Sequence, residues 1–180
     1  MSQLYEYQNT KYDDANTMYG IYWVGQTFTV GGTAHTVTSV KIKACRYGNP
    51  GTLTLSIRAT SGSLPTGGDL TSGTIDANTF TTDTAGAWYE ITVTLYLLSA
   101  SIMYAIVCRC SSGNGTNYSQ WRLGTGAGTY PNGASVSSSN SGSSWAVGSP
   151  AGDRTFEVWG NPPVTIPTVT TQAADGIGLD

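Results

Sequence analysis

Residues 39–60 constrain the fold of this chain most strongly, because they alternate apolar and polar side chains in two successive runs. One run extends from Val40 to Cys45 and the other from Leu53 to Arg58, with the turn-forming segment YGNPG (47–51) between them. Such period-two alternation is typical of β-strands with one buried and one solvated face. We therefore predict a β-hairpin. The residues predicted to face the core are Val40, Ile42, Leu53, Leu55 and Ile57.

The opposite side of this predicted hairpin carries three cations, Lys41, Lys43 and Arg58. Two interpretations remain open. The cations form a small basic surface patch, or they keep a strand face soluble and discourage edge-to-edge pairing.

The composition favours strands over helices along the whole chain. Only 11% of the 180 residues are charged, while glycine, serine and threonine are abundant. No window carries the repeated three- and four-residue apolar spacing of an amphipathic helix. The 5 Trp and 11 Tyr argue against disorder, because disordered segments are poor in aromatic residues. We predict an all-β protein, a jelly-roll-like antiparallel β-sandwich of about eight to ten strands.

The sequence divides into three parts. Residues 1–20 are polar and rich in tyrosine, and we expect an N-terminal arm that either packs across the sandwich or docks on a neighbouring molecule. Residues 21–160 are predicted to form the sandwich, with the apolar run 102–110 as a central strand covered on both sides. Residues 161–180 begin with three prolines in seven residues, which favours an extended, semi-rigid C-terminal tail or linker.

The three cysteines, Cys45, Cys108 and Cys110, cannot all pair within one chain. Cys108 and Cys110 are two apart on a predicted strand, so they project to the same face and are poorly placed to bond each other. A bridge from Cys45 to either of them cannot be read from sequence. The favoured interpretation is that all three are buried, reduced thiols.

Charge and hydropathy exclude several partners. The net charge is -3 and there are only 8 Lys and Arg residues, so no basic stripe is available to bind nucleic acid. No run of about 18 apolar residues predicts membrane insertion. The first twenty residues lack the basic and apolar regions of a secretory signal. A domain of extracellular type without such a signal is expected either to be a fragment or to leave the cell by another route, such as host lysis.

The sequence predicts no catalytic residue. It contains no G-x-S-x-G nucleophile elbow. The single histidine, His35, follows a predicted turn and is expected to be exposed to solvent. Glu90 and Glu157 are predicted on outward strand positions, and they face each other only by coincidence of strand pairing. We predict no enzymatic activity, no cofactor and no metal site.

A carbohydrate site is the alternative that the glycine-rich region 111–152 suggests. Sugars are held by aromatic rings together with amide and carboxylate hydrogen bonds, and this region supplies those residue types. The candidate ligand-binding residues are Tyr118, Gln120, Trp121, Tyr130 and Asn132. The competing interpretation is structural: Trp121 and Trp145 fill the ends of the sandwich, because aromatic rings are the largest core-filling groups.

The order of several motifs resembles that of a known type of module. The motifs are GQTFTV, RYGNPGTLTLSIRAT, LPTGGDLTSGTI, WYEITVTL, YAIVC, YPNGASV and DRTFEVWG. Together they resemble the jelly-roll β-sandwich modules of phage virion proteins and of bacterial surface proteins, including choice-of-anchor domains. The tail TVTTQAADGIGLD is similar to the opening strand of an immunoglobulin- or fibronectin-like repeat. The resemblance implies adhesion, display or decoration, and it supplies no catalytic residues.

Two functional expectations follow. The first is a non-enzymatic viral structural protein at the virion surface, a phage capsid-decoration or fibre-base module. Its expected partners are further copies of itself in a homo-oligomer or other shell proteins, with adhesion to host-surface glycans as an added role. The second is a carbohydrate-binding module of a secreted or surface-anchored protein, located outside the cell.

Overall fold

The computed structural model describes residues 1–126, 129–148 and 152–163. These residues form strands, connecting turns and one short 3-10 helix. In chain order the elements are β1 (Gln3–Gln8), β2 (Asp14–Met18), β3 (Trp23–Thr29), β4 (His35–Tyr47), β5 (Thr52–Ser61), β6 (Leu64–Asp76), η1 (Ala77–Thr79), β7 (Ala87–Leu98), β8 (Met103–Arg109), β9 (Tyr118–Thr125), β10 (Ser135–Ser138), β11 (Ala146–Val147), β12 (Gly152–Arg154) and β13 (Phe156–Asn161).

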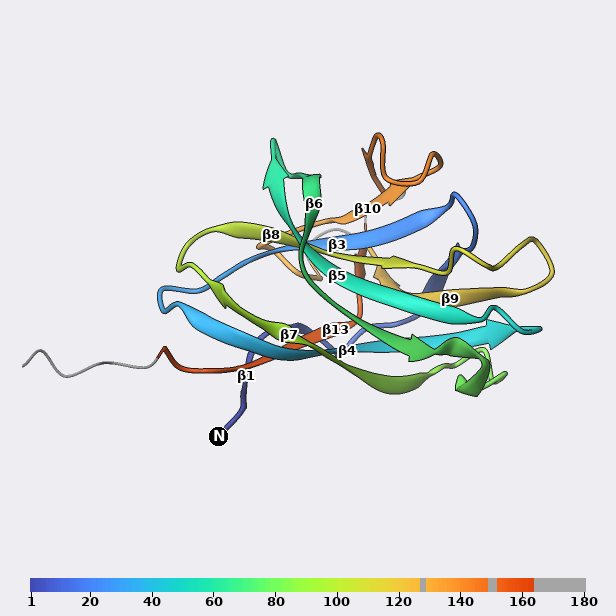
Figure 1. Cartoon of the computed structure of the whole chain (residues 1–180), viewed down its shortest axis with the longest axis horizontal. Helices are drawn as coiled ribbons and strands as arrows, with labels where there is room; N and C mark the ends of the chain where they lie inside the picture. The colour runs from blue at the N-terminus through green and yellow to red at the C-terminus, as the bar shows by residue number, and fades with distance from the viewer. Residues whose placement is uncertain (127–128, 149–151, 164–180) are drawn as a thin grey trace, which may run out of the picture.

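The strands form two antiparallel sheets that pack against each other (Figure 1). The first sheet has the order β1-β13-β4-β9-β12, with β7 also paired to β4 and β2 also paired to β9. The second sheet has the order β11-β10-β3-β8-β5-β6. The predicted all-β sandwich is thus confirmed. It has more strands than expected, since residues 1–20 add β1 and β2 and the last predicted strand divides into β12 and β13.

The alternating segment 39–60 does not form a hairpin, and that prediction is wrong. Strand β4 belongs to the first sheet and β5 to the second, so the YGNPG segment carries the chain from one sheet to the other. Gly48 and Gly51 have φ angles of 58° and 78°, which glycine adopts without steric cost. The predicted core residues are nevertheless all fully buried, because they face each other across the sandwich instead of lying side by side.

The first of the two interpretations of the cations, a basic surface patch, does not hold. Lys41 and Lys43 project from the outer face of the first sheet, over the rings of Trp159 and Tyr12, whereas Arg58 projects from the second sheet, over Trp23. Arg58 donates from Nε to Oδ1 of Asp69 at 2.8 Å, and Arg109 donates from Nη2 to the other oxygen of that carboxylate at 2.6 Å. The three predicted cations therefore lie on opposite faces of the protein.

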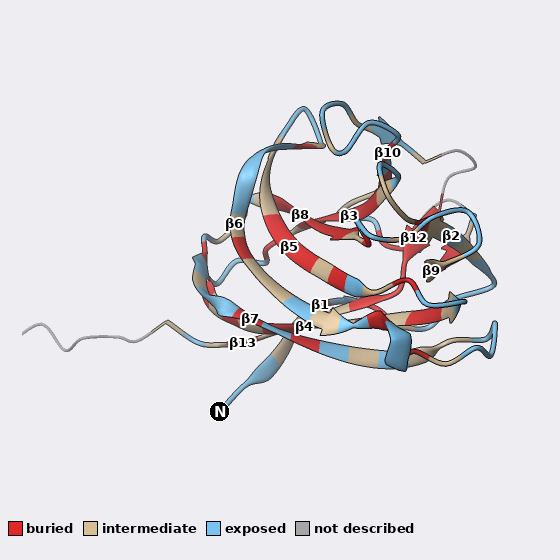
Figure 2. Ribbon diagram, turned by 45° about the vertical axis from the view of Figure 1, so that its right-hand side comes forward, coloured by how far each residue is buried: buried red, intermediate tan, exposed pale blue. Residues whose placement is uncertain are grey.

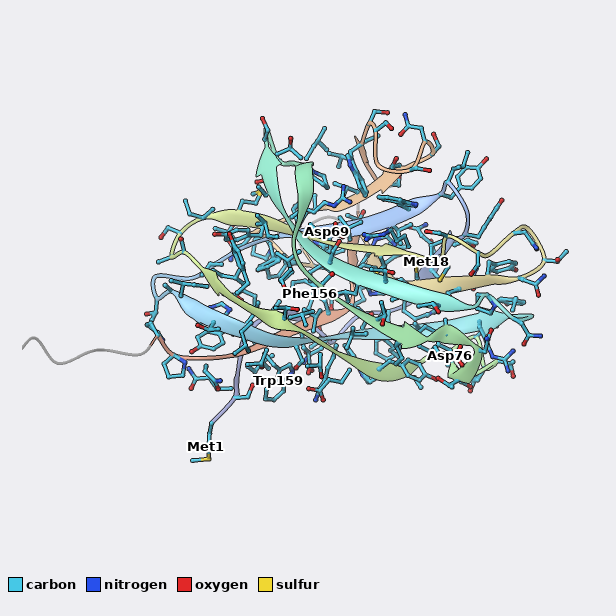
Figure 3. All side chains as sticks on the ribbon, in the orientation of Figure 1. Met1, Met18, Asp69, Asp76, Phe156 and Trp159 are labelled. Carbon is cyan, nitrogen blue, oxygen red and sulfur yellow. The ribbon has the colours of Figure 1, made fainter. Side chains whose placement is uncertain are left out.

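The core lies between the facing sides of the two sheets, where Figure 2 shows buried residues on both layers. On β13, Phe156 points inward and contacts Phe28 at a ring-centroid distance of 6.1 Å, while Trp159 points outward (Figure 3). Strand β8 lies between β3 and β5 in the second sheet, as expected of the central strand. The described residues contain no helix that is long and apolar enough to cross a membrane.

The first twenty residues pack across the sandwich, which is the first of the two placements left open by the sequence. Strand β1 pairs with β13 and β2 pairs with β9, both antiparallel. Met18 is fully buried in the core. The tail predicted at 161–180 lies largely outside the described residues, which end at Pro163.

The two long edges of the sandwich differ. At one edge, β6 of the second sheet lies against β7 of the first, and the Thr71 hydroxyl donates to the carbonyl oxygen of Thr94. At the other edge, a groove lies between β2 and β12 of the first sheet and β10 and β11 of the second. We call the edge formed by β6 and β7 the closed edge, and the edge formed by β2, β10, β11 and β12 the open edge.

Candidate functional site

A groove of about 370 Å³ lies at the open edge, between β2 and β12 on one side and β3, β10 and β11 on the other. This volume falls within the range usual for small-ligand sites. Aromatic and hydroxyl side chains dominate its walls. We call this feature the open-edge groove.

Three aromatic side chains line the open-edge groove, namely Tyr22, Trp23 and Trp145. Tyr22 is 43% exposed, and the two tryptophans are partly buried. Trp23 is fixed in place because its Nε1 donates to the carbonyl oxygen of Gly20 at 3.1 Å. Its ring also packs so closely on the backbone of Gly142, which has a φ of 79°, that a Cβ there would overlap it. Trp23 is therefore held in one orientation by the protein itself.

Hydroxyl and amide groups form much of the rest of the walls. Strand β10 contributes Ser135 and Ser137, and the exposed edge strand β2 contributes Asn16 and Thr17. Ser138 fixes the loop that follows, since its Oγ accepts hydrogen bonds from the backbone N–H groups of residues 140 and 142 at 3.3 and 2.9 Å. This loop carries Trp145 to the groove. Short side chains of this kind can donate and accept hydrogen bonds along an extended polar ligand.

The floor of the open-edge groove contains Arg154, whose side chain is 1% exposed. Its Nε donates to the carbonyl oxygen of Gly25 at 2.9 Å, and its backbone N–H donates to Oε1 of Gln26 at 2.8 Å. The neighbouring Asp153 is held by Gln26 Nε2 at 2.9 Å and by the backbone N–H of Tyr130 at 2.8 Å. Burial lowers the pKa of Arg154 to about 10, so the guanidinium stays charged at neutral pH.

The structure does not bring the five predicted ligand-binding residues together. Tyr118 and Gln120 lie on the outer face of β9, where Tyr118 stacks on Tyr47 at 4.7 Å and Gln120 donates to Thr17 Oγ1 at 3.2 Å. Trp121 points the other way, as alternation along a strand requires. It is fully buried, and its Nε1 donates to the carbonyl oxygen of Thr155 at 2.7 Å. In this position Trp121 fills the core.

The other two predicted residues lie apart from β9. Tyr130 is 8% exposed and packs edge-on against Phe156 at 5.1 Å. It lines a smaller cavity of about 250 Å³ that borders the open-edge groove at Ser135 and Gly148. Asn132 is exposed, and its carbonyl oxygen accepts a hydrogen bond from Thr29 Oγ1 at 3.0 Å.

Sequence reasoning did not assign Tyr22, Trp23 or Trp145 to a site. One signal was available, because the core alternation of the strand begins at Val24 and leaves two aromatic residues before it unexplained. Trp145 was noticed, but as a core-filling residue. What the sequence could not show is that the segments around residues 22 and 145 meet at one edge.

The prediction that His35 is exposed is wrong. His35 is fully buried at the start of β4, where its ring stacks on Tyr5 at 3.7 Å, and its Nε2 lies 3.4 Å from Oε2 of Glu6. Burial lowers the pKa of His35 to about 4. Burial likewise raises the pKa of Glu6 to about 7, although a hydrogen bond from the Gly31 N–H opposes this shift. Strand β1 covers the histidine, and its pairing was not foreseen.

Glu90 and Glu157 lie in one row across the first sheet, each paired in register with Lys41 between them. The cross-strand alignment that seemed a coincidence therefore occurs. Both carboxylates already have partners: Glu90 accepts from Ser39 Oγ at 2.6 Å and lies 3.7 Å from Lys41 Nζ. Glu157 accepts from Asn9 Nδ2 and from the indole of Trp159, each at 2.9 Å.

The three cysteines are free and buried, as favoured from the sequence. Burial raises the pKa of each thiol, to about 11 for Cys110. Among the described residues, no three His, Cys, Asp or Glu side chains gather in a way that could hold a metal ion.

Comparison with known proteins adds no family to this description. No model of a known protein family matches the chain, and no curated protein matches it significantly in sequence.

Proposed function

We propose that this protein is a non-enzymatic binding module that holds a carbohydrate in the open-edge groove. The observation that carries the proposal is the combination of Tyr22, Trp23 and Trp145 with hydroxyl and amide side chains in one groove of about 370 Å³. Aromatic rings pack on the apolar faces of sugars, while hydroxyl and amide groups satisfy the sugar hydroxyls. The partners would be cell-surface or extracellular glycans.

A glycan array tests this proposal directly. The wild-type protein is expected to bind a defined set of glycans, and Trp145→Ala is expected to weaken binding about tenfold, because truncating an aromatic anchor usually costs more than about 1 kcal/mol. The matched control is Trp88→Ala, since Trp88 is 37% exposed on β7 and lies outside the groove. An array with no wild-type binding, or equal losses in both variants, would contradict the proposal.

The absence of catalysis is part of the proposal and has its own test. A glycoside hydrolase needs two carboxylates that face each other across the substrate. Glu90 and Glu157 lie two strands apart, and Lys41 lies between them. We expect no turnover of polysaccharide or ester substrates. Turnover that Glu90→Gln or Glu157→Gln abolishes would show that the protein is an enzyme.

A second proposal is a structural role at the virion surface, as a phage decoration or fibre-base module that assembles with itself or with shell proteins. The observation that favours it is the exposure of Leu95, Leu97 and Ile102, at 66%, 53% and 48%. Exposed apolar side chains close together in the chain are typical of protein contacts. Light scattering should then report an oligomer that Leu95→Asp or Leu97→Asp dissociates, and a monomeric wild type would contradict it. Glycan adhesion is compatible with this location.

A further inference from the structure

Arg154 has a hydrogen-bond donor that the protein leaves unused. Its Nε bonds to the carbonyl oxygen of Gly25, and its Nη2 bonds to that of Val136 at 3.4 Å. Its Nη1 is buried and has no hydrogen-bond partner among the residues that the structure describes. Nearly all buried polar groups in folded proteins are paired, so an unpaired donor on a charged group needs a specific reason.

The charge of Arg154 also has no carboxylate partner, although the Trp121 ring lies 5.4 Å from the guanidinium. Within the part of the chain that the structure describes, the ion pairs involve other cations, and no carboxylate lies within 4.0 Å of this guanidinium. The adjacent Asp153 is directed instead to Gln26, Thr129 and Tyr130. Burying an unpaired charge is costly unless an opposite charge approaches it.

The same residue lies in the floor of the open-edge groove, beneath walls that carry serine hydroxyls and Trp145. A ligand in the groove therefore meets a fixed positive charge together with hydroxyl donors and an aromatic ring. The only acidic wall residue among those described is Asp14, which is exposed on the edge strand β2. A cationic floor with one acidic rim residue selects the charge of a ligand as well as its shape.

We propose that the open-edge groove selects acidic sugars, with the carboxylate of the sugar directed to Arg154 and its ring lying against Trp145. This inference rests on the proposed carbohydrate function and specifies its ligand class. A carboxylate is the natural partner of an unpaired guanidinium, because charge-assisted hydrogen bonds are about twice as strong as neutral ones. The serine hydroxyls contact the remaining oxygens of the ligand.

The experiment compares oligogalacturonides with neutral galactose oligomers of the same length by isothermal titration calorimetry on the full chain. The acidic ligand is expected to bind about tenfold more tightly, an advantage that declines as salt is added. Equal affinity for both ligands overturns the acidic-sugar inference and leaves the carbohydrate function standing. Failure of both ligands, together with an empty glycan array, overturns both.

Substitutions of charged residues test the contribution of the groove rim separately from that of Arg154. Asp14→Asn removes the acidic wall residue, so the ratio of acidic to neutral affinity should rise about two- to fivefold. Glu90→Gln removes an exposed carboxylate outside the groove and is the matched control, with no change in the ratio. A ratio that Asp14→Asn leaves unchanged, or that Glu90→Gln raises equally, contradicts the inference.

Arg154→Gln tests the floor itself. The acidic preference should disappear in this variant, while thermal unfolding monitors its fold. Retention of the full preference in a folded Arg154→Gln protein contradicts the inference. The Asp14→Asn comparison decides the matter independently if loss of the buried guanidinium unfolds the chain.

Discussion

The closed and open edges of the sandwich are both built from antiparallel strands, but the sheets are in tight contact at one edge and leave a groove at the other. At the closed edge, β6 approaches β7 so tightly that a Cβ at Gly73 would overlap the carbonyl oxygen of Thr92. At the open edge, the two sheets leave a groove that Arg154 lines. Polar groups join the sheets at both edges, since Arg154 Nε donates to the carbonyl oxygen of Gly25 at the open edge. The difference is that the open edge keeps a groove of about 370 Å³ between the joined strands.

The largest expected effect separates the core beneath the open-edge groove from the walls of the groove. Trp121→Ala removes a fully buried indole next to Arg154, whose guanidinium lies 5.4 Å from the ring centroid. The free energy of unfolding should fall by about 3–5 kcal/mol in urea denaturation. Trp145→Ala, at the partly exposed wall, should stay within about 1 kcal/mol of the wild type. Similar losses in the two variants would mean that the walls of the groove contribute as much to stability as the core beneath it.

The closed edge gives the next largest effect. Gly73→Ala forces a Cβ against the Thr92 carbonyl, so the unfolding free energy should fall by about 1–3 kcal/mol. Gly68→Ala on the same strand is the matched control, because no atom lies within 4 Å of the position of its Cβ. It should change stability by less than about 0.5 kcal/mol. If Gly73→Ala is equally mild, the two sheets are not tightly joined at this edge.

The smallest effect concerns a buried cluster of polar side chains on β1 and β4, outside the strands of both edges, formed by Tyr5, Glu6 and His35. The raised pKa of Glu6, about 7, means that its contribution to stability is lost as the pH rises from 4.5 to 7. The lowered pKa of His35, about 4, means that its contribution is lost as the pH falls from 6.5 to 4. The two contributions oppose each other between pH 4.5 and 6.5, so the wild type should be nearly insensitive to pH there.

Glu6→Gln exposes the histidine contribution. The melting temperature of the variant, relative to the wild type, should rise as the pH increases from 4.5 to 7, because only the wild type loses the glutamate contribution. Glu90→Gln, on the exposed face, should follow the wild-type curve. Parallel curves for Glu6→Gln and the wild type would show that burial does not perturb this cluster.

The sequence predicted well which face of a strand each side chain occupies, but it predicted poorly which strands pair with each other. Alternation placed Val40 and Leu55 in the core, but it could not show that β4 and β5 lie in different sheets, since a short turn-rich segment permits either arrangement. The same limit applied to the site. The residue types of a carbohydrate site were recognised, yet Trp121 was assigned to it while its alternation relative to Gln120 was overlooked. His35 was misplaced because β1, which is distant in the sequence, covers it in the fold.

The sequence by itself determined that this chain forms an all-β sandwich, because side-chain alternation, turn residues and the lack of helical periodicity are local properties. It also determined that Phe156 and Val158 face inward, since their strand alternates cleanly. Only the tertiary structure decided which edge closes and which opens, because strand partners are selected by packing over long sequence separations. The groove brings together residues 14, 22, 145 and 154, and no local pattern links positions so far apart.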